Sequence, residues 1–152
     1  MTETVLVAVR NDDDRRLEKL TESATDAVDP DGRVVVVHVF DQERYTDIRS
    51  QLNIPTDGEA TPDDIVDRHS VSRRVTERLE DSDVDVEVRG AVGSESDAIL
   101  EISDEVDAGL IIIGGRKRSP SGKALFGSTA QTVLLEADCP VTFVKDRSTV
   151  PA

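Results

Sequence analysis

The stretch "RVVVVHV" (residues 33–39) contains four consecutive valines and is apolar on both faces of an extended chain. A strand with this pattern is typical of the interior of a parallel sheet that helices cover on both sides. "LIII" (110–113) has the same pattern, and three further short apolar runs occur at "TVLVAV" (4–9), "VDVEV" (84–88) and "VTFV" (141–144). Five strands are therefore predicted, with residues 33–39 and 110–113 at the centre of the sheet and the strictly alternating "VDVEV" nearer an edge.

Helical patterns separate these runs, with apolar residues at three- and four-residue spacing. The predicted helices cover residues 17–28, about 61–79, 94–106 and 126–137. Strands that alternate with helices over crossovers of this length predict an α/β fold: one doubly wound, five-stranded parallel sheet with helices on both faces. Residues 1–152 are expected to form a single domain, in which residues 41–60 show no clear period and form a mobile connection.

The chain is strongly acidic, because 32 Asp and Glu side chains against 18 Lys and Arg give a net charge of −14. This charge destabilises a compact state unless salt screens it, so we expect a protein of a saline cytoplasm. It also argues against nonspecific binding to nucleic acid or to membrane surfaces, which needs cations. Residues 1–10 lack the pattern of a signal peptide, and no apolar run approaches the ~20 residues that span a bilayer.

One segment departs from the acidic character of the chain. Residues 111–129, "IIIGGRKRSPSGKALFGST", contain four cations and no acid. The segment directly follows the fourth predicted strand, and in wound sheets ligands bind at the carboxyl ends of strands. It leads into a helix that starts near residues 127–129, where free backbone N–H groups favour an anion. The segment is therefore a candidate phosphate site, although a loop that only caps the last helix remains the alternative.

Several known chemistries do not fit the sequence. "KRSPSGKA" fails the P-loop pattern, because Lys117 stands where glycine is needed and Ala124 where Ser or Thr is needed. A phospho-receiver domain needs an aspartate at the end of the third strand, where Arg89 stands. No Ser, His and acid spacing predicts a catalytic triad, and His38 is expected to be a core residue with a local partner. No dedicated catalysis is therefore expected.

The sequence gives little indication of a metal site. With two distant histidines and one cysteine, no zinc-type cluster appears. Residues 12–14 are three consecutive aspartates that could recruit Mg²⁺ beside a nucleotide, but acids at the start of a helix account for them as well.

Residues 111–129 resemble the signature of the universal stress proteins, in which a glycine, a second glycine three residues on and Gly-Ser or Gly-Thr ten residues later bind a nucleotide phosphate. Gly114, Gly127 and Ser128 stand at matching positions. The similarity extends to "VLVAV", "VVVHV" and "ADCPVTFV" and covers nearly all of the chain except residues 41–60. The resemblance implies the strand order 3-2-1-4-5 of the adenine-nucleotide alpha-hydrolase-like fold, and a stress-response or regulatory protein that binds ATP or AMP.

The resemblance also implies a set of site residues. The base and sugar would be lined by Ala8, Val9 and Arg10, with Val39 against the adenine. The phosphates would be surrounded by Gly114, Arg116, Lys117, Gly127, Ser128 and Thr129, with electrostatic assistance from Lys123. Two residues depart from the family pattern: Lys117 replaces its second glycine, and Arg10 stands where nucleotide-binding members carry Asp. A nucleotide-independent homodimeric interaction module of the same fold therefore stays open.

The last predicted strand has a further expected role. In the order 3-2-1-4-5 it lies at an edge, and it is apolar at most positions until Lys145. An edge of this kind favours pairing with another strand. Universal stress proteins typically dimerise here, so the resemblance implies a homodimer through Val141, Thr142, Phe143 and Val144.

Overall fold

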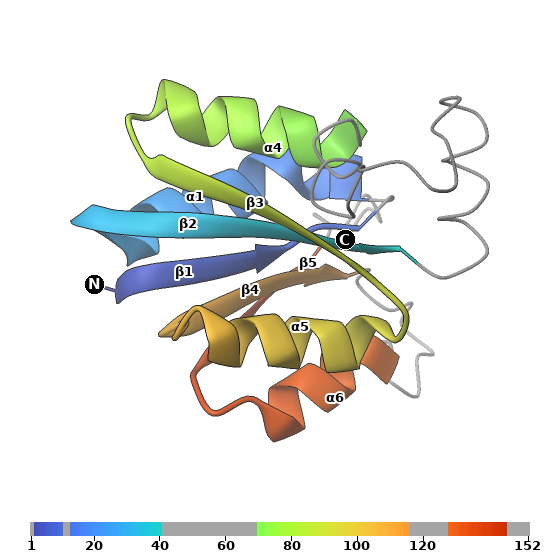
Figure 1. The fold of residues 1–152 in the computed structure, drawn as a ribbon. Coiled ribbons are helices and arrows are strands. Elements are labelled where there is room, and N and C mark those ends of the chain that lie inside the picture. Colours follow the sequence, from blue (N-terminus) through green and yellow to red (C-terminus); the bar gives the residue numbers. More distant parts are fainter. Residues whose placement is uncertain (1, 11–12, 41–69, 116–127, 146–152) are drawn as a thin grey trace, which may run out of the picture.

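The structure, a computed structural model, describes residues 2–10, 13–40, 70–115 and 128–145 (Figure 1). Its strands are β1 (Thr2–Ala8), β2 (Val28–Phe40), β3 (Asp85–Val92), β4 (Leu110–Gly115) and β5 (Val141–Lys145). They form one sheet in the order β3-β2-β1-β4-β5, and every neighbouring pair is parallel. The predicted fold class is confirmed, including the strand order.

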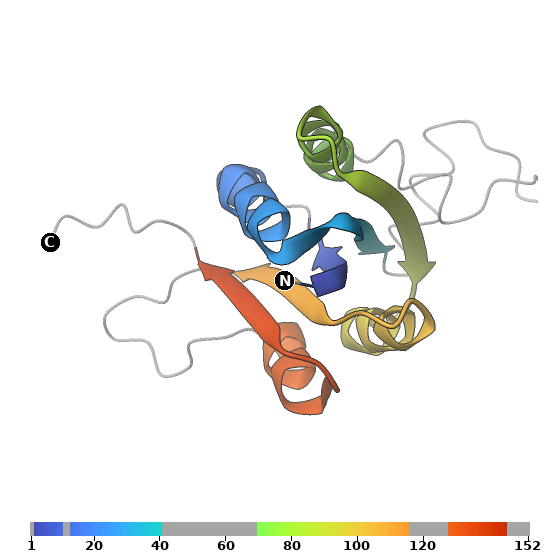
Figure 2. The same cartoon turned by 90° about the vertical axis from the view of Figure 1, so that its left-hand side faces the viewer.

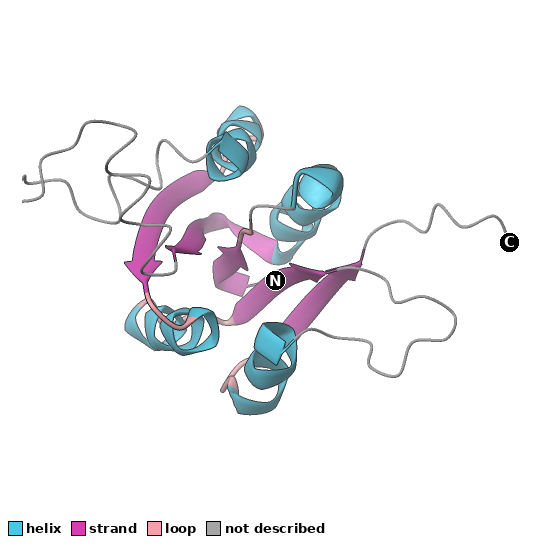
Figure 3. Cartoon of the chain, turned by 90° about the vertical axis from the view of Figure 1, so that its right-hand side faces the viewer, coloured by secondary structure: helices cyan, strands magenta, loops and turns pink. Residues whose placement is uncertain are grey.

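Helices cover both faces of this sheet. They are the short 3₁₀ helix η1 (Asp13–Arg16), α1 (Leu17–Ala27), α4 (Ser70–Asp81), α5 (Glu95–Glu105) and α6 (Ser128–Glu136). End-on views show α1 and α4 on one side of the strands and α5 and α6 on the other (Figure 2, Figure 3). The helix predicted to begin near residue 61 is described from Ser70 on, and the connection predicted at 41–60 lies outside the described residues.

The core has two layers, because successive residues of a strand point to opposite faces of the sheet. In β2, Val34 and Val36 belong to the layer packed against α1 and α4. Val35 and Val37 belong to the opposite layer, which is packed against α5 and α6. All four side chains are at most 1% exposed. Residues 33–39 therefore form a central strand that is covered on both faces, as the run of valines predicts.

The two edge strands differ in charge. On β3, Glu87 accepts from Arg33 of the neighbouring strand at 3.1 Å, and Arg89 pairs with Glu105 of α5 at 2.7 Å. On β5, Val141 and Phe143 are half-buried, and Lys145 is the one charged residue of the strand. The alternating run "VDVEV" thus forms a charged edge strand, and the apolar run "VTFV" forms an apolar edge strand on the other side of the sheet.

The described helices are too short or too polar to cross a bilayer, so none of them is a candidate membrane span.

Candidate functional site

The carboxyl ends of three central strands meet at one edge of the sheet. Ala8 pairs with Val37 of β2 and with Ile113 of β4. The residues that come next therefore lie together at this edge: Val9 directly after β1, Val39 in β2 and Gly114 in β4. The predicted residues Arg116, Lys117, Lys123 and Gly127 lie outside the described residues, and Ser128 is described only as the first residue of α6.

Arg10 connects this edge to the two helices that lie below it in Figure 1. Its Nε lies 3.2 Å from Oε2 of Glu95, the first residue of α5. The other carboxylate oxygen of Glu95, Oε1, accepts a hydrogen bond of 2.9 Å from Thr129 Oγ1, in the first turn of α6. We call this arrangement the Arg10–Glu95–Thr129 bridge. It brings two predicted site residues together through a third residue that the sequence did not indicate as part of the site.

A second ion pair lies at the same edge, within η1, and is buried. Asp13 Oδ1 accepts from Arg16 Nε at 2.7 Å and lies 2.6 Å from Arg16 Nη2. The two side chains are 0% and 1% exposed. Asp13 Oδ2 accepts from the backbone N–H of Arg10 at 2.6 Å. Asp13 therefore stands at the start of a helix, as predicted, and it also fixes the backbone at the end of β1.

The first glycine of the signature packs against this buried pair. A Cβ atom on Gly114 would lie 2.8 Å from Arg16 Nε and 2.8 Å from Asp13 Oδ1. Real Cβ atoms essentially never approach other heavy atoms so closely, and interiors packed at crystal-like density have no spare room for the methyl group. Glycine at position 114 is thus required by packing inside the protein. A role of Gly114 in binding phosphate stays a prediction.

His38 links the ends of β1 and β2. Its ring is buried, and Nδ1 lies 2.7 Å from the carbonyl oxygen of Val9. Because a carbonyl oxygen only accepts, Nδ1 carries the proton. The ring also contacts Phe40 edge-on, with ring centroids 4.5 Å apart. The prediction that His38 is a core residue with a local partner is confirmed.

The apolar residues predicted to line the base divide between the two faces of the sheet. Ala8 is buried and Val39 half-buried in the layer packed against α5 and α6. Val9 is 1% exposed in the opposite layer, and its backbone N–H and carbonyl oxygen bond to Val37 and His38. Ala8 and Val39 share a face of the edge with the bridge, whereas the side chain of Val9 belongs to the core.

No group of three or more His, Cys, Asp or Glu side chains that could hold a metal ion occurs in the part of the chain that the structure describes. The free thiol of Cys139 lies near the start of β5, and so at the amino ends of the strands, away from the candidate site. Burial raises the pKa of Cys139 above its ordinary value, so the thiol is protonated at neutral pH.

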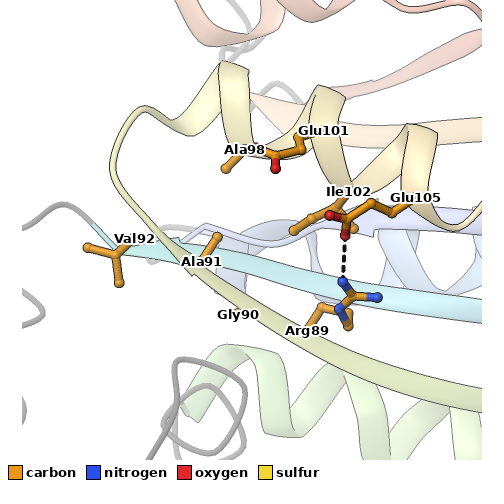
Figure 4. A pocket seen from close by; sticks show the side chains of 8 residues that line it. All are labelled: Arg89, Gly90, Ala91, Val92, Ala98, Glu101, Ile102 and Glu105. Carbon is orange, nitrogen blue, oxygen red and sulfur yellow. Dashed lines mark hydrogen bonds and ion pairs between the residues drawn. The ribbon is translucent and has the colours of Figure 1, made fainter.

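A polar cleft of about 290 Å³ lies elsewhere, between β3 and α5. Figure 4 shows the ion pair of Arg89 with Glu105 across it. The cleft is lined by Arg89, Gly90, Ala91, Val92, Ala98, Glu101, Ile102 and Glu105. None of the predicted site residues lines it.

Sequence reasoning missed Glu95 and Arg16, and it gave Asp13 only as a helix-start acid or a recruiter of Mg²⁺, not as a member of a buried ion pair. An acid in the first turn of a helix is common, because it interacts favourably with the helix dipole. Nothing in the sequence distinguishes Glu95 from such an ordinary acid. The buried pair lies in a run of three aspartates followed by two arginines. The sequence does not show which of these five side chains form the pair.

Comparison with known proteins gives a consistent result. The model of the universal stress protein family matches residues 1–145. A universal stress protein of Mycolicibacterium smegmatis is 38% identical over 120 residues, which are 78% of this chain and 92% of that protein. A universal stress protein structure from Archaeoglobus fulgidus is 30% identical with a TM-score of 0.64, covering 95% of this chain and 100% of the other.

A second structure of the same kind contains a nucleotide. The universal stress protein from Archaeoglobus fulgidus in complex with dAMP is 26% identical, with a TM-score of 0.59, and the match covers 93% of this chain and 97% of that one. The family model and the curated relative each extend over most of the chain. The chain therefore belongs to the universal stress protein family.

Proposed function

We propose that this universal stress protein binds an adenine nucleotide, ATP or AMP, at the carboxyl edge of β1, β2 and β4. One observation carries the proposal: Arg10, Val39, Gly114 and the start of α6 come from four separate elements and converge at this edge. The dAMP complex of a 26% identical relative supports the choice of ligand. The protein would act as a stress-response or regulatory module in a saline cytoplasm.

The proposed roles follow the chemistry of each residue. Val39 contributes apolar surface for the base, with Ala8 and Val9 behind it in the core, and Arg10 contacts the sugar. The phosphates lie at the start of α6, where backbone N–H groups and the helix dipole favour an anion. The proposed phosphate-binding residues are Gly114, Arg116, Lys117, Gly127, Ser128 and Thr129, with Lys123 nearby. Mg²⁺ enters the proposal only as a counter-ion of the phosphates.

The proposal includes no catalytic step. Hydrolysis of a nucleotide needs a base that can activate water. Two of the carboxylates described near this edge, those of Asp13 and Glu95, are held in ion pairs. The nucleotide is therefore proposed as a bound signal, and not as a substrate.

Titration calorimetry of the protein with ATP and AMP in molar KCl tests the proposal. We expect both nucleotides to bind and to raise the melting temperature, which should itself rise from low to molar KCl because salt screens the net charge of −14. Lys117→Glu should weaken ATP binding by about tenfold or more, because it places a negative charge beside the phosphates.

Lys19→Glu is the matched control for this variant, since Lys19 is exposed on α1 and the change in charge is the same. It should leave the affinity within about twofold. The proposal fails if millimolar ATP and AMP give neither heat nor a thermal shift in the parent protein.

A second candidate function is a homodimeric interaction module that works without nucleotide. The ion pair of Arg10 with Glu95 favours it, because that pair engages a residue proposed for the ligand. Both candidates share a dimer through Val141, Thr142, Phe143 and Val144 of β5, as the exposed edge of this strand suggests.

Light scattering in molar KCl should give the mass of a dimer. Thr142→Arg should give a monomer, because Thr142 is exposed on β5 and a two-fold pairing of this strand would bring two added cations close together. Gln131→Arg, an exposed position on α6, is the matched control and should stay dimeric. A monomeric parent, or a dimeric Thr142→Arg variant, would contradict this interface.

A further inference from the structure

The carboxylate of Glu95 is shared between two elements of the proposed site. One oxygen lies 3.2 Å from Arg10 Nε and the other 2.9 Å from Thr129 Oγ1. Arg10 is proposed to contact the sugar, and Thr129 the phosphates. Both groups therefore have an anionic partner within the chain, and this partner comes from a different helix, α5.

The position of this carboxylate is the one that a ligand phosphate would favour. Thr129 is the second residue of α6, where the hydroxyl group, the N–H groups of the first turn and the positive end of the helix dipole all favour a negative charge. Glu95 supplies such a charge through its contact with Thr129. A phosphate that takes the hydroxyl of Thr129 must first displace the glutamate or share its donors.

The bridge is accessible enough to be opened. The side chains of Arg10 and Glu95 are 36% and 25% exposed, whereas those of Asp13 and Arg16 are at most 1% exposed. Partly exposed ion pairs contribute little to stability, because water and salt compete for both partners. Glu95 can therefore leave Thr129 without unfolding the site, while the buried pair keeps the end of β1 in place.

We propose that Glu95 determines ligand specificity as a built-in competitor for phosphate. Its carboxylate occupies the hydroxyl group of Thr129 at the start of α6, so it weakens the binding of nucleotides through their phosphates more than it affects the binding of the nucleoside part. This inference rests on the proposed nucleotide site. It adds a residue from α5 to that site. Glu95 weakens phosphate binding, whereas the cations of residues 111–129 are proposed to strengthen it.

Glu95→Gln isolates the effect, because the amide keeps the size of the side chain and an oxygen for Thr129 but removes the charge. Calorimetry in molar KCl compares adenosine, AMP and ATP as ligands of the parent and the variant. We expect Glu95→Gln to bind AMP and ATP about tenfold more tightly, as expected for removing a charge a few ångströms from a phosphate. The affinity for adenosine should change much less, because adenosine meets the bridge only through Arg10.

Glu101→Gln is the matched control, since Glu101 is exposed on the same helix and the change in net charge is identical. It should leave all three affinities unchanged, and melting curves show whether both variants are folded. Tighter AMP binding in Glu95→Gln alone, even where the parent shows none, supports the inference.

Three results would overturn it. Unchanged or weaker AMP binding in Glu95→Gln, with a parent that binds AMP, rejects the competitor and keeps the nucleotide site. An equal gain for adenosine and AMP rejects the phosphate as the point of competition. If neither protein binds any of the ligands, the proposed function and the inference fail together.

Discussion

Replacement of Asp13 by alanine should lower the free energy of unfolding by about 3–5 kcal/mol, which is the usual effect of removing one member of a buried ion pair. Arg16 is 1% exposed, and its guanidinium group cannot lose its proton to escape the penalty. The variant also removes the hydrogen bond of 2.6 Å that the backbone N–H of Arg10 donates to Asp13 Oδ2. Urea unfolding of parent and variant in molar KCl measures the difference.

Two further variants test whether the loss of stability comes from the buried ion pair. In the double variant Asp13→Leu/Arg16→Met, most of the loss should be recovered, because apolar side chains of similar volume often replace a buried ion pair at no cost. Glu77→Ala breaks an exposed pair with Arg73 on α4 and should cost no more than about 0.5 kcal/mol. If Asp13→Ala costs as little as Glu77→Ala, the Asp13–Arg16 pair is not buried in solution as it is in the structure.

Gly114→Ala should lower the free energy of unfolding by about 1–3 kcal/mol, as is typical when a methyl group is forced into a packed interior. The new Cβ would meet Arg16 Nε and Asp13 Oδ1 at 2.8 Å each. Neither atom can move into solvent, since both side chains are buried. The same unfolding experiment measures the loss.

Gly109→Ala is the matched control. Its Cβ would meet only Thr2 Cγ2 closely, at 2.7 Å, and that methyl group ends a side chain near the start of the chain. We expect a change within about 0.5 kcal/mol. In the Asp13→Ala background, Gly114→Ala should cost less than in the parent, because the shared contact is already gone. Additive losses would contradict the proposed contact.

The fold was predictable because hydrophobic pattern reports burial directly. Four valines in residues 34–37 fill two core layers at once, which is possible only in a strand covered on both faces. The alternation in "VDVEV" indicated a strand with one polar face, and β3 is an edge strand. The order of the strands came from the resemblance to the family, since the pattern alone does not specify which strands are neighbours.

The site was less predictable, because its contacts join residues that are distant in sequence. Arg10, Glu95 and Thr129 lie in three different elements, and no local pattern records that they meet. Arg16 was unexpected for another reason. A charged residue beside other charged residues is usually exposed, so composition argues against the almost complete burial that the structure has.

The two rims of the sheet also limit how copies of the chain can assemble. Charged side chains on the β3 rim, Glu87 and Arg89, engage partners within the same molecule and discourage a foreign strand from adding there. The β5 rim has no comparable barrier before Lys145. In the proposed dimer each copy uses its single apolar edge strand, so we expect assembly to stop at two copies instead of continuing into ribbons.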